Sequence, residues 1–300
     1  MGQCILIGGG SGLIGTRLTE ILLQKGHQVR HLGRKAGTDR SGQVKTFAWD
    51  IHRQAIDEHA FDGVDVVINL AGANINGHRW TKSYKEELLV SRTGSTQLIV
   101  NAVKQRSSIR FIAGSAIGYY GFGDSTQVFK ETDAPGNDFM AQLTVEWEKV
   151  ADQVKNVTHI RTGIVISSRG GALEEMAKPI KLYVGSPLGS GKQVVSWIHM
   201  EDEVGIIIHV IENNLSGIFN AVAPQPATNE EMTKEIAKKL HKPLLLPNVP
   251  GFVLKIILGQ MSEAVVNGSR VSSEKIESTG YKFQYPTIES ALSASLHVAH

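Results

Sequence analysis

The sequence contains one cysteine, Cys4, among its 300 residues. An internal disulfide is therefore excluded, and such sparse use of cysteine is typical of a reducing compartment. Long apolar runs are also missing, since every run is much shorter than the roughly 20 residues that a membrane-spanning helix needs. No charged leader followed by a long apolar core opens the sequence. We therefore expect a cytoplasmic protein without a membrane segment.

The sequence has no excess of charge of one sign, because 31 Lys and Arg residues oppose 29 Asp and Glu residues and leave a net charge of +2. Basic residues form no long run. Both facts argue against nucleic acid or an anionic membrane as a partner and favour a small-molecule substrate. The 11 histidines and the single cysteine show no metal-ligand spacing, so we predict no metal site.

Short β-branched runs alternate with amphipathic segments through the first half of the chain. The helical segments are Thr16 to Lys25, Tyr84 to Lys104 and Phe139 to Val154. Strand, helix and strand at this spacing imply parallel pairing through crossover helices. The sequence therefore predicts an α/β fold with a doubly wound parallel sheet. Its expected strands are CILIG, HQVRHLG, VKTFAWD, VDVVINLAG, IRFIAGSA, THIRTGIVIS and, near the end, GIFNAVA.

The alternation stops after about Gly170, where glycine, proline and serine recur. This composition predicts loops and short strands. A later helix is expected from Asn229, capped by Asn229 or Thr228. We therefore predict a dinucleotide-binding domain over 1–170, completed by about 200–223. A small substrate lobe is expected over 171–199 and 224–300.

A glycine-rich turn follows the first expected strand directly. Gly9, Gly12 and Gly15 have the spacing G-x-x-G-x-x-G between this strand and an amphipathic helix. Unpaired amides and the positive end of the helix favour an anion there, and glycine lets the backbone approach a diphosphate closely. The turn predicts a dinucleotide site made by Gly9, Ser11, Gly12, Leu13, Ile14 and Gly15.

The end of the second expected strand indicates which dinucleotide binds. Gly33 stands where NAD-binding sequences carry a carboxylate for the ribose 2′-hydroxyl, and Arg34 and Lys35 follow. Two cations suit a 2′-phosphate, so the sequence favours NADP(H) over NAD(H). Asp50 either lies beside the adenine or is a turn residue at a strand end. Leu70, Ala71 and Gly72 are expected to let the cofactor approach the backbone.

The combination of GGxGxxG with NLAGA, SAIGYYG, RTGIVIS and SWIHMED resembles the extended and atypical short-chain dehydrogenase/reductases. Within this group the chain resembles an NAD-dependent epimerase/dehydratase-like branch, which includes proteins described as cell-division inhibitors or nucleoside-diphosphate-sugar epimerases. The similarity runs nearly from end to end. It implies a Rossmann core of about seven strands and a small C-terminal lobe, with the active cleft between them.

The resemblance also assigns roles to residues in the second half of the sheet. Ser115 falls where relatives keep a hydroxyl that hydrogen-bonds a substrate oxygen. Thr162, Gly163 and Ile164 fall where the backbone meets the nicotinamide. Arg161 either pairs with a substrate phosphate or with a carboxylate in the core.

Active relatives carry a tyrosine and, four residues later, a lysine that lowers the pKa of the phenol. None of the 6 tyrosines in this chain has a lysine at that spacing. Alignment on Ser115 puts Phe139 in the tyrosine position and Leu143 in the lysine position. Neither side chain can exchange a proton. Proton transfer by the usual pair is therefore in doubt.

Other residues could carry a proton or contact a substrate, and each has a structural alternative. Tyr120 either faces the nicotinamide or is a packed ring with a bonded hydroxyl. His199 is either catalytic or structural. Lys192, in GSPLGSGKQ, either contacts an anionic substrate or belongs to a plain turn, since the loop lacks the pattern of a nucleotide triphosphatase. Trp197 is either core, cleft wall or a stacking surface for substrate.

Two functions are compatible with these residues. The first is an NADP(H)-dependent oxidoreductase or epimerase-like enzyme with an unusual proton donor, acting on a small carbonyl compound or nucleotide-sugar. The alternative is an NADP(H)-binding sensor or regulator without turnover. Relatives also suggest a homodimer through the helices at Tyr84 to Lys104 and Phe139 to Val154.

Overall fold

The computed structural model describes residues 2–123 and 127–296 and contains a nine-stranded sheet. Eight of its strands follow one another along a single path, and the ninth, β5, pairs with β4 off this path. The order is β13 (Gly217–Ala221), β9 (Thr158–Thr162), β7 (Arg110–Ala116), β6 (Val66–Asn69), β1 (Cys4–Gly8), β2 (Gln28–Gly33), β4 (Lys45–Asp50) and β3 (Gly37–Thr38), with β5 (Ala55–Ile56) also paired to β4.

The five strands β7, β6, β1, β2 and β4 are parallel to one another. The short strands β3 and β5 run antiparallel to β4. All residues of β1 and β6 are buried, as expected for strands covered on both faces. The predicted doubly wound α/β sheet is confirmed.

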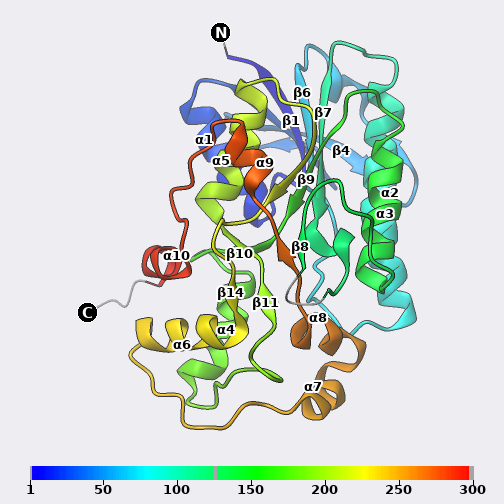
Figure 1. The fold of residues 1–300 in the computed structure, drawn as a ribbon. Helices are drawn as coiled ribbons and strands as arrows, with labels where there is room; N and C mark the ends of the chain where they lie inside the picture. Colours follow the sequence, from blue (N-terminus) through cyan, green and yellow to red (C-terminus); the bar gives the residue numbers. More distant parts are fainter. Residues whose placement is uncertain (1, 124–126, 297–300) are drawn as a thin grey trace. The chain divides into compact units, whose positions relative to one another are not determined.

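Helices cover both faces of this sheet. Figure 1 places α1 (Leu13–Gln24) on one side and α2 (Lys82–Val103) with α3 (Phe139–Ala151) on the other. Helices α2 and α3 lie side by side, and Gln153, just after α3, bonds both Lys104 and Gln97 of the α2 region. Leu98 and Ile99 of α2 pack on strand residues such as Val67 in one core. Burying apolar side chains of this kind contributes about 1.5–3 kcal/mol each.

The described chain divides into two compact units that are interleaved along the sequence. The first contains the residues up to Ala116, then Gln142–Arg161 and Ile207–Phe219; the second contains Ile117–Ala141, Thr162–Ile206 and the residues from Asn220 onward. The division into 1–170 with 200–223, and 171–199 with 224–300, stays a prediction. Residues 1, 124–126 and 297–300 of those ranges lie outside the described part.

The second unit contains three two-stranded ladders. Strand β10 (Ile164–Ile166) is parallel to β12 (Trp197–His199), and β15 (Arg270–Val271) is parallel to β8 (Val128–Phe129). Strands β11 (Val194–Val195) and β14 (Ala227–Thr228) are antiparallel. Its helices include α4 (Ala172–Lys181), α6 (Asn229–Lys239), α7 (Gly251–Leu258), α8 (Ser262–Val266), α9 (Glu274–Ser278) and α10 (Ile288–Ser295), while α5 (Met200–Glu212) runs from this unit into the first.

Helix α4 was not expected, because Pro179 and the neighbouring glycines favoured loops. Pro179 lies in the last turn of the helix and removes one backbone hydrogen bond there, while Leu173, Ala177 and Ile180 form the buried face of the helix. Glu174 and Glu175 lie in the first turn, which suits the helix dipole. The prediction of loops and short strands was therefore wrong for this segment.

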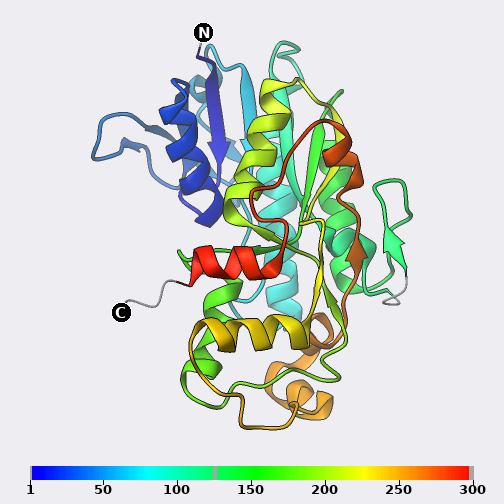
Figure 2. The same ribbon diagram turned by 60° about the vertical axis from the view of Figure 1, so that its left-hand side comes forward.

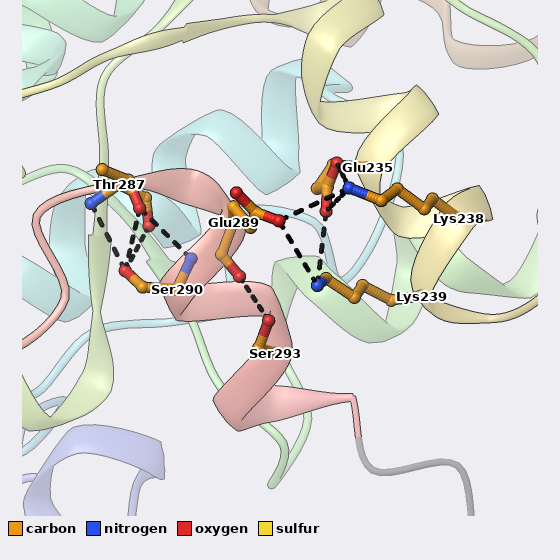
Figure 3. A network of polar contacts seen from close by, with 7 residues as sticks. All are labelled: Glu235, Lys238, Lys239, Thr287, Glu289, Ser290 and Ser293. Carbon is orange, nitrogen blue, oxygen red and sulfur yellow. Dashed lines mark hydrogen bonds and ion pairs between the residues drawn. The ribbon is translucent and has the colours of Figure 1, made fainter.

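Helices α6 and α10 lie next to each other in both views (Figures 1 and 2). Thr228 caps α6 through a capping box with Glu231, as one of the two predicted caps. Figure 3 shows Lys238 and Lys239 of α6 reaching Glu289 of α10 at 3.4 and 3.9 Å. Exposed pairs of this kind contribute about 0–1 kcal/mol. The two helices are therefore held mainly by the apolar core that they share, which includes Ile236 and Leu292.

No helix within the described residues is long and apolar enough to cross a membrane. In the same part of the chain, no three His, Cys, Asp or Glu side chains come together as a group that could hold a metal ion.

Candidate functional site

The turn between β1 and α1 fits tightly against the end of β6. Gly9 has a φ of +79°, and a Cβ atom added there would lie 2.8 Å from the carbonyl carbon of Leu70 and from the amide of Ala71. A Cβ on Gly15 would lie 2.3 Å from the carbonyl oxygen of Gly9. Only glycine allows these approaches. The structure therefore brings together the turn and residues 70–71, two segments that were separately predicted to meet the cofactor.

The amides at the start of α1 are free to bind a ligand. The Gly12 amide donates to the carbonyl of Gly9, but among the described residues no acceptor is bonded to the amides of Ser11, Leu13 or Ile14. Helix α1 has no side-chain cap and no acidic residue in its first turn. Its positive end is therefore not neutralised by the protein, which favours an anion.

Asn69 holds the loop after β6 in place, a role that the sequence did not reveal. Its side-chain oxygen accepts the amide of Ala71 at 3.2 Å, and its Nδ2 donates to Ser95 at 3.3 Å and Thr96 at 3.0 Å on α2. The side chain is fully buried. Its position as the last residue of a buried strand was the available signal, because a polar group there needs partners.

The loop after β2 lies at the same end of the strands as the glycine turn, namely their carboxyl ends. Residue pairs Gly8 with Leu32 and Gly8 with Asn69 are in register, so β1, β2 and β6 end together. Arg34 and Lys35 are exposed just beyond β2, and no carboxylate in the described part of the chain is paired with either. Two free cations therefore stand where the 2′-phosphate is predicted.

Asp50 makes the contacts of a turn residue at the end of β4. Its Oδ1 accepts the amides of Arg53 at 3.0 Å and His52 at 2.9 Å. These amides, with the Arg53 bond as the largest cause, lower the pKa of the carboxyl. The structure thus agrees with the turn alternative, while a place beside the adenine stays a prediction.

Ser115 and Arg161 are joined by Glu148, which sequence reasoning missed. Glu148 accepts the Ser115 hydroxyl at 2.5 Å and two Arg161 nitrogens, Nε and Nη2, at 2.8 Å each. Arg161 is 1% exposed and Glu148 is 6% exposed. Of the two alternatives for Arg161, the structure shows the pair with a core carboxylate. Glu148 lies on the buried face of α3 with Thr144, and a charged residue on such a face was the missed signal.

The ion pair between Glu148 and Arg161 also limits the hydrogen bonds that Ser115 can make with another group. An ionised carboxylate only accepts hydrogen bonds, so the single hydroxyl proton of Ser115 is directed at Glu148. Only its lone pairs remain for another group. The hydrogen bond between Ser115 and a substrate oxygen stays a prediction: a substrate hydroxyl can donate to these lone pairs, whereas donation by Ser115 requires its bond to Glu148 to break.

Tyr120, His199 and Trp197 are interior residues of the second unit. Tyr120 is 2% exposed and donates its hydroxyl to Asn220 at 2.7 Å. His199 accepts the Glu201 amide at Nδ1, so its neutral ring carries the proton on Nε2, which bonds Ser295. Burial lowers the pKa of His199 to about 4. These contacts match the structural alternatives for both residues.

Trp197 has no exposed surface, and its indole donates to the carbonyl of Gln225 at 3.1 Å. It belongs to a core cluster of the second unit. This agrees with the core alternative and leaves no face for a substrate ring. Lys192, in contrast, is exposed, and its charge adds to the larger effect of Lys234 in lowering the pKa of Glu230.

Thr162 donates its hydroxyl to the carboxyl of Glu203 at 2.8 Å. Glu203, also missed from the sequence, is fully buried, and burial raises its pKa to about 8. Its Oε2 atom has no partner among the described residues. The adjacent Gly163 donates to the carbonyl of Ala221, and Ile164 to that of Ser196. The expected strand THIRTGIVIS is divided at Gly163 into β9 and β10.

The two positions aligned with the tyrosine and lysine are built into α3. Phe139 is the first residue of this helix, and Leu143 is 3% exposed. Each side chain is apolar, and neither can donate a proton.

Comparison with known proteins identifies the chain's relatives. A family model described as the NAD dependent epimerase/dehydratase family matches residues 5–221. A second model, a domain of unknown function (DUF1731), matches residues 249–295. The epimerase family protein Mb2239 of Mycobacterium bovis is 35% identical over 296 residues, which cover 96% of each chain.

Two solved structures are similar along nearly the whole chain. The crystal structure of human epimerase family protein SDR39U1 with NADPH has a TM-score of 0.87 and 31% identity, and covers 98% of this chain and 99% of that one. The nucleoside-diphosphate sugar epimerase of Corynebacterium glutamicum has a TM-score of 0.79 and 28% identity, covering 99% of this chain and 58% of that one. On these matches, the chain belongs to the NAD-dependent epimerase/dehydratase family.

Proposed function

We propose that this chain binds NADP(H) in its first unit, with the diphosphate on the free amides at the start of α1. The observation that carries the proposal is the fit of the turn. Glycines 9 and 15 bring the backbone into close contact, and the amides of Ser11, Leu13 and Ile14 have no other partner in the described chain. This arrangement is a ready site for a phosphate group.

Arg34 and Lys35 are proposed to hold the 2′-phosphate and so to favour NADP(H) over NAD(H). Both are exposed just after the carboxyl end of β2, at the same end of the strands as the glycine turn. Charge-assisted hydrogen bonds to phosphate suit these side chains. The crystal structure of the human relative with NADPH supports this choice.

A methyl group on Gly12 tests the site at a small cost to the fold. Gly12 has a φ of −77°, is exposed, and a Cβ there would meet only the Gly9 carbonyl oxygen, in a tight contact of 3.2 Å. Gly12→Ala should therefore fold and melt slightly below the wild type but lose NADPH binding by calorimetry, because the methyl group obstructs the approach of the diphosphate to the amides. Gly251→Ala, where a Cβ meets nothing within 4 Å, is the matched control. Undiminished binding by Gly12→Ala, or no heat from the wild type, contradicts the proposal.

We further propose an oxidoreductase or epimerase-like activity on a small carbonyl compound or nucleotide-sugar. NADPH, when bound, supplies a hydride. The proton has to come from the chain, and Phe139 and Leu143 cannot provide it. We propose Glu203 and Thr162 for this role. With a pKa of about 8 the carboxyl is largely protonated at neutral pH. Proton transfer reverses the bond that the structure shows: the carboxyl gives its proton to the Thr162 oxygen while the threonine hydroxyl gives its own proton to a substrate oxygen.

A second candidate function is an NADP(H)-binding sensor or regulator without turnover. A specific observation favours it: the hydroxyls of Ser115 and Tyr120 and both ring nitrogens of His199 are engaged inside the protein. None of these three predicted catalytic residues is more than 6% exposed.

Turnover separates the two functions. The enzyme, given NADPH and a panel of carbonyl compounds and nucleotide-sugars, should show substrate-dependent loss of nicotinamide absorbance, and Glu203→Gln should abolish it. A sensor should show none with any member. If Phe139→Tyr with Leu143→Lys creates activity that the parent lacks, the sensor function gains support.

Oligomeric state and location are proposals as well. We propose a cytoplasmic homodimer that uses the exposed faces of α2 and α3. Light scattering of the pure protein tests the dimer, and a monomer mass at micromolar concentration would contradict it.

A further inference from the structure

Arg92 lies on α2 with its guanidinium against the loop that follows β6. Its Nη1 donates to the carbonyl of Leu88 and its Nη2 to the carbonyl of Ala73, each at 3.1 Å. The guanidinium also lies over the ring of Trp147, 5.4 Å from its centroid. The side chain is half-buried and belongs wholly to the first unit.

This guanidinium lacks a counter-ion. Within the described residues, no carboxylate lies at ion-pair distance from Arg92, and burial lowers its pKa to about 10. Arg161, by comparison, is buried against Glu148. A guanidinium has five N–H donors, of which the two carbonyls use two. Charged groups removed from water are normally paired with a group of opposite charge. For Arg92 no described residue supplies an anion, so we expect an anionic ligand to do so.

The position of Arg92 places that anion beside the proposed cofactor site. Gly9 contacts Leu70 and Ala71, and the next residue, Gly72, lies under Arg92: a Cβ on Gly72 would be 3.0 Å from the guanidinium carbon. Gly72 itself is exposed. Residues 70–72 therefore lie between the glycine turn, which packs on Leu70 and Ala71, and the guanidinium of Arg92, which packs on Gly72.

We propose that Arg92 is the cation of a phosphate-binding subsite at residues 72–73. Its three remaining N–H groups hold phosphate oxygens, either of the dinucleotide's own diphosphate or of a second, phosphorylated ligand. The inference rests on the proposed NADP(H) site for its setting. It goes beyond that site because nothing in the glycine pattern requires a cation on α2.

Arg92→Gln removes the charge and keeps a side chain of hydrogen-bond donors. Arg110→Gln is the matched control, because Arg110 also bonds only neutral groups, the carbonyls of Val210, Ile211 and Leu215 and the Asn214 side chain. Arg110 is the first residue of β7 and is paired with Val66, the first residue of β6. It therefore lies at the amino-terminal ends of these parallel strands, whereas the glycine turn follows the carboxyl end of β1. Arg92→Lys keeps the charge and should retain part of the effect.

The first measurement is calorimetric titration with NADPH. If Arg92→Gln weakens binding about tenfold or more and Arg110→Gln does not, the phosphate belongs to the dinucleotide. The second is the melting temperature with saturating NADPH and added inorganic pyrophosphate. If pyrophosphate raises it in the wild type and in Arg110→Gln but not in Arg92→Gln, the phosphate belongs to a second ligand.

Equal behaviour of Arg92→Gln and Arg110→Gln in both measurements overturns the proposal and leaves Arg92 as a tether for the loop. The result also separates the two proposals. If the wild type does not bind NADPH but its stabilisation by pyrophosphate depends on Arg92, the cofactor proposal fails and the subsite stands.

Discussion

Replacing Glu148 by glutamine should unfold the first unit more readily than any surface change on the same helix. The carboxylate of Glu148 accepts three hydrogen bonds, two from Arg161 at 2.8 Å and one from Ser115 at 2.5 Å. Glutamine has one acceptor oxygen and no charge. Arg161, only 1% exposed, would lose the charged group that accepts two of its hydrogen bonds. Breaking a buried pair in this way costs about 3–5 kcal/mol.

Urea unfolding, followed by far-UV circular dichroism, measures this cost. Glu146→Gln is the control on α3, because Glu146 is half exposed and lies 3.7 Å from Lys149. That pair should contribute about 0–1 kcal/mol. The double variant Glu148→Leu with Arg161→Met removes both charges, so it should lose less than Glu148→Leu alone.

A loss for Glu148→Gln no larger than that for Glu146→Gln would refute the reasoning. The loss of stability in the double variant should also be smaller than the sum of the losses in Glu148→Leu and Arg161→Met. Equality would refute the reasoning, because additive losses would mean that the two groups do not interact.

Three further results are expected. Arg34→Ala should weaken NADPH by about 1.5–3 kcal/mol and leave NADH unchanged, since only NADPH carries the 2′-phosphate; equal losses in calorimetry would contradict the assignment. The pKa of Glu203 is raised from 4.5 to about 8 in the folded state. Between these two pH values the folded protein keeps a proton that the unfolded chain has already released. Stability should therefore fall across that window by up to about 1.4 kcal/mol per pH unit, and the fall should shrink in Glu203→Gln. Gly10→Ala puts a methyl group 2.4 Å from the His31 ring and should cost about 1–3 kcal/mol, most of it regained with His31→Ala; a loss that persists would locate the strain elsewhere.

Much of the fold and part of the site could be predicted because their signals are local. Alternating strand and helix patterns predicted β1, β2, β4, β6 and β7, and the glycine spacing predicted the turn that packs on Leu70 and Ala71. Periodicity and the conformational range of glycine act within a few residues, so they can be read from the chain alone. The end of THIRTGIVIS was harder, because the division at Gly163 depends on bonds to distant residues.

The sequence by itself determined the α/β class, the glycine turn, the two cations after β2 and the absence of the tyrosine–lysine pair. Only the tertiary structure decided what the polar interior does: Glu148 joins Ser115 to Arg161, Glu203 meets Thr162, and Arg92 has no counter-ion among the described residues. The physical reason is that a charged side chain takes its partner from whichever segment packs against it. That partner is separated along the chain by 13 residues for Arg161 and by 41 for Thr162, and no local pattern encodes it.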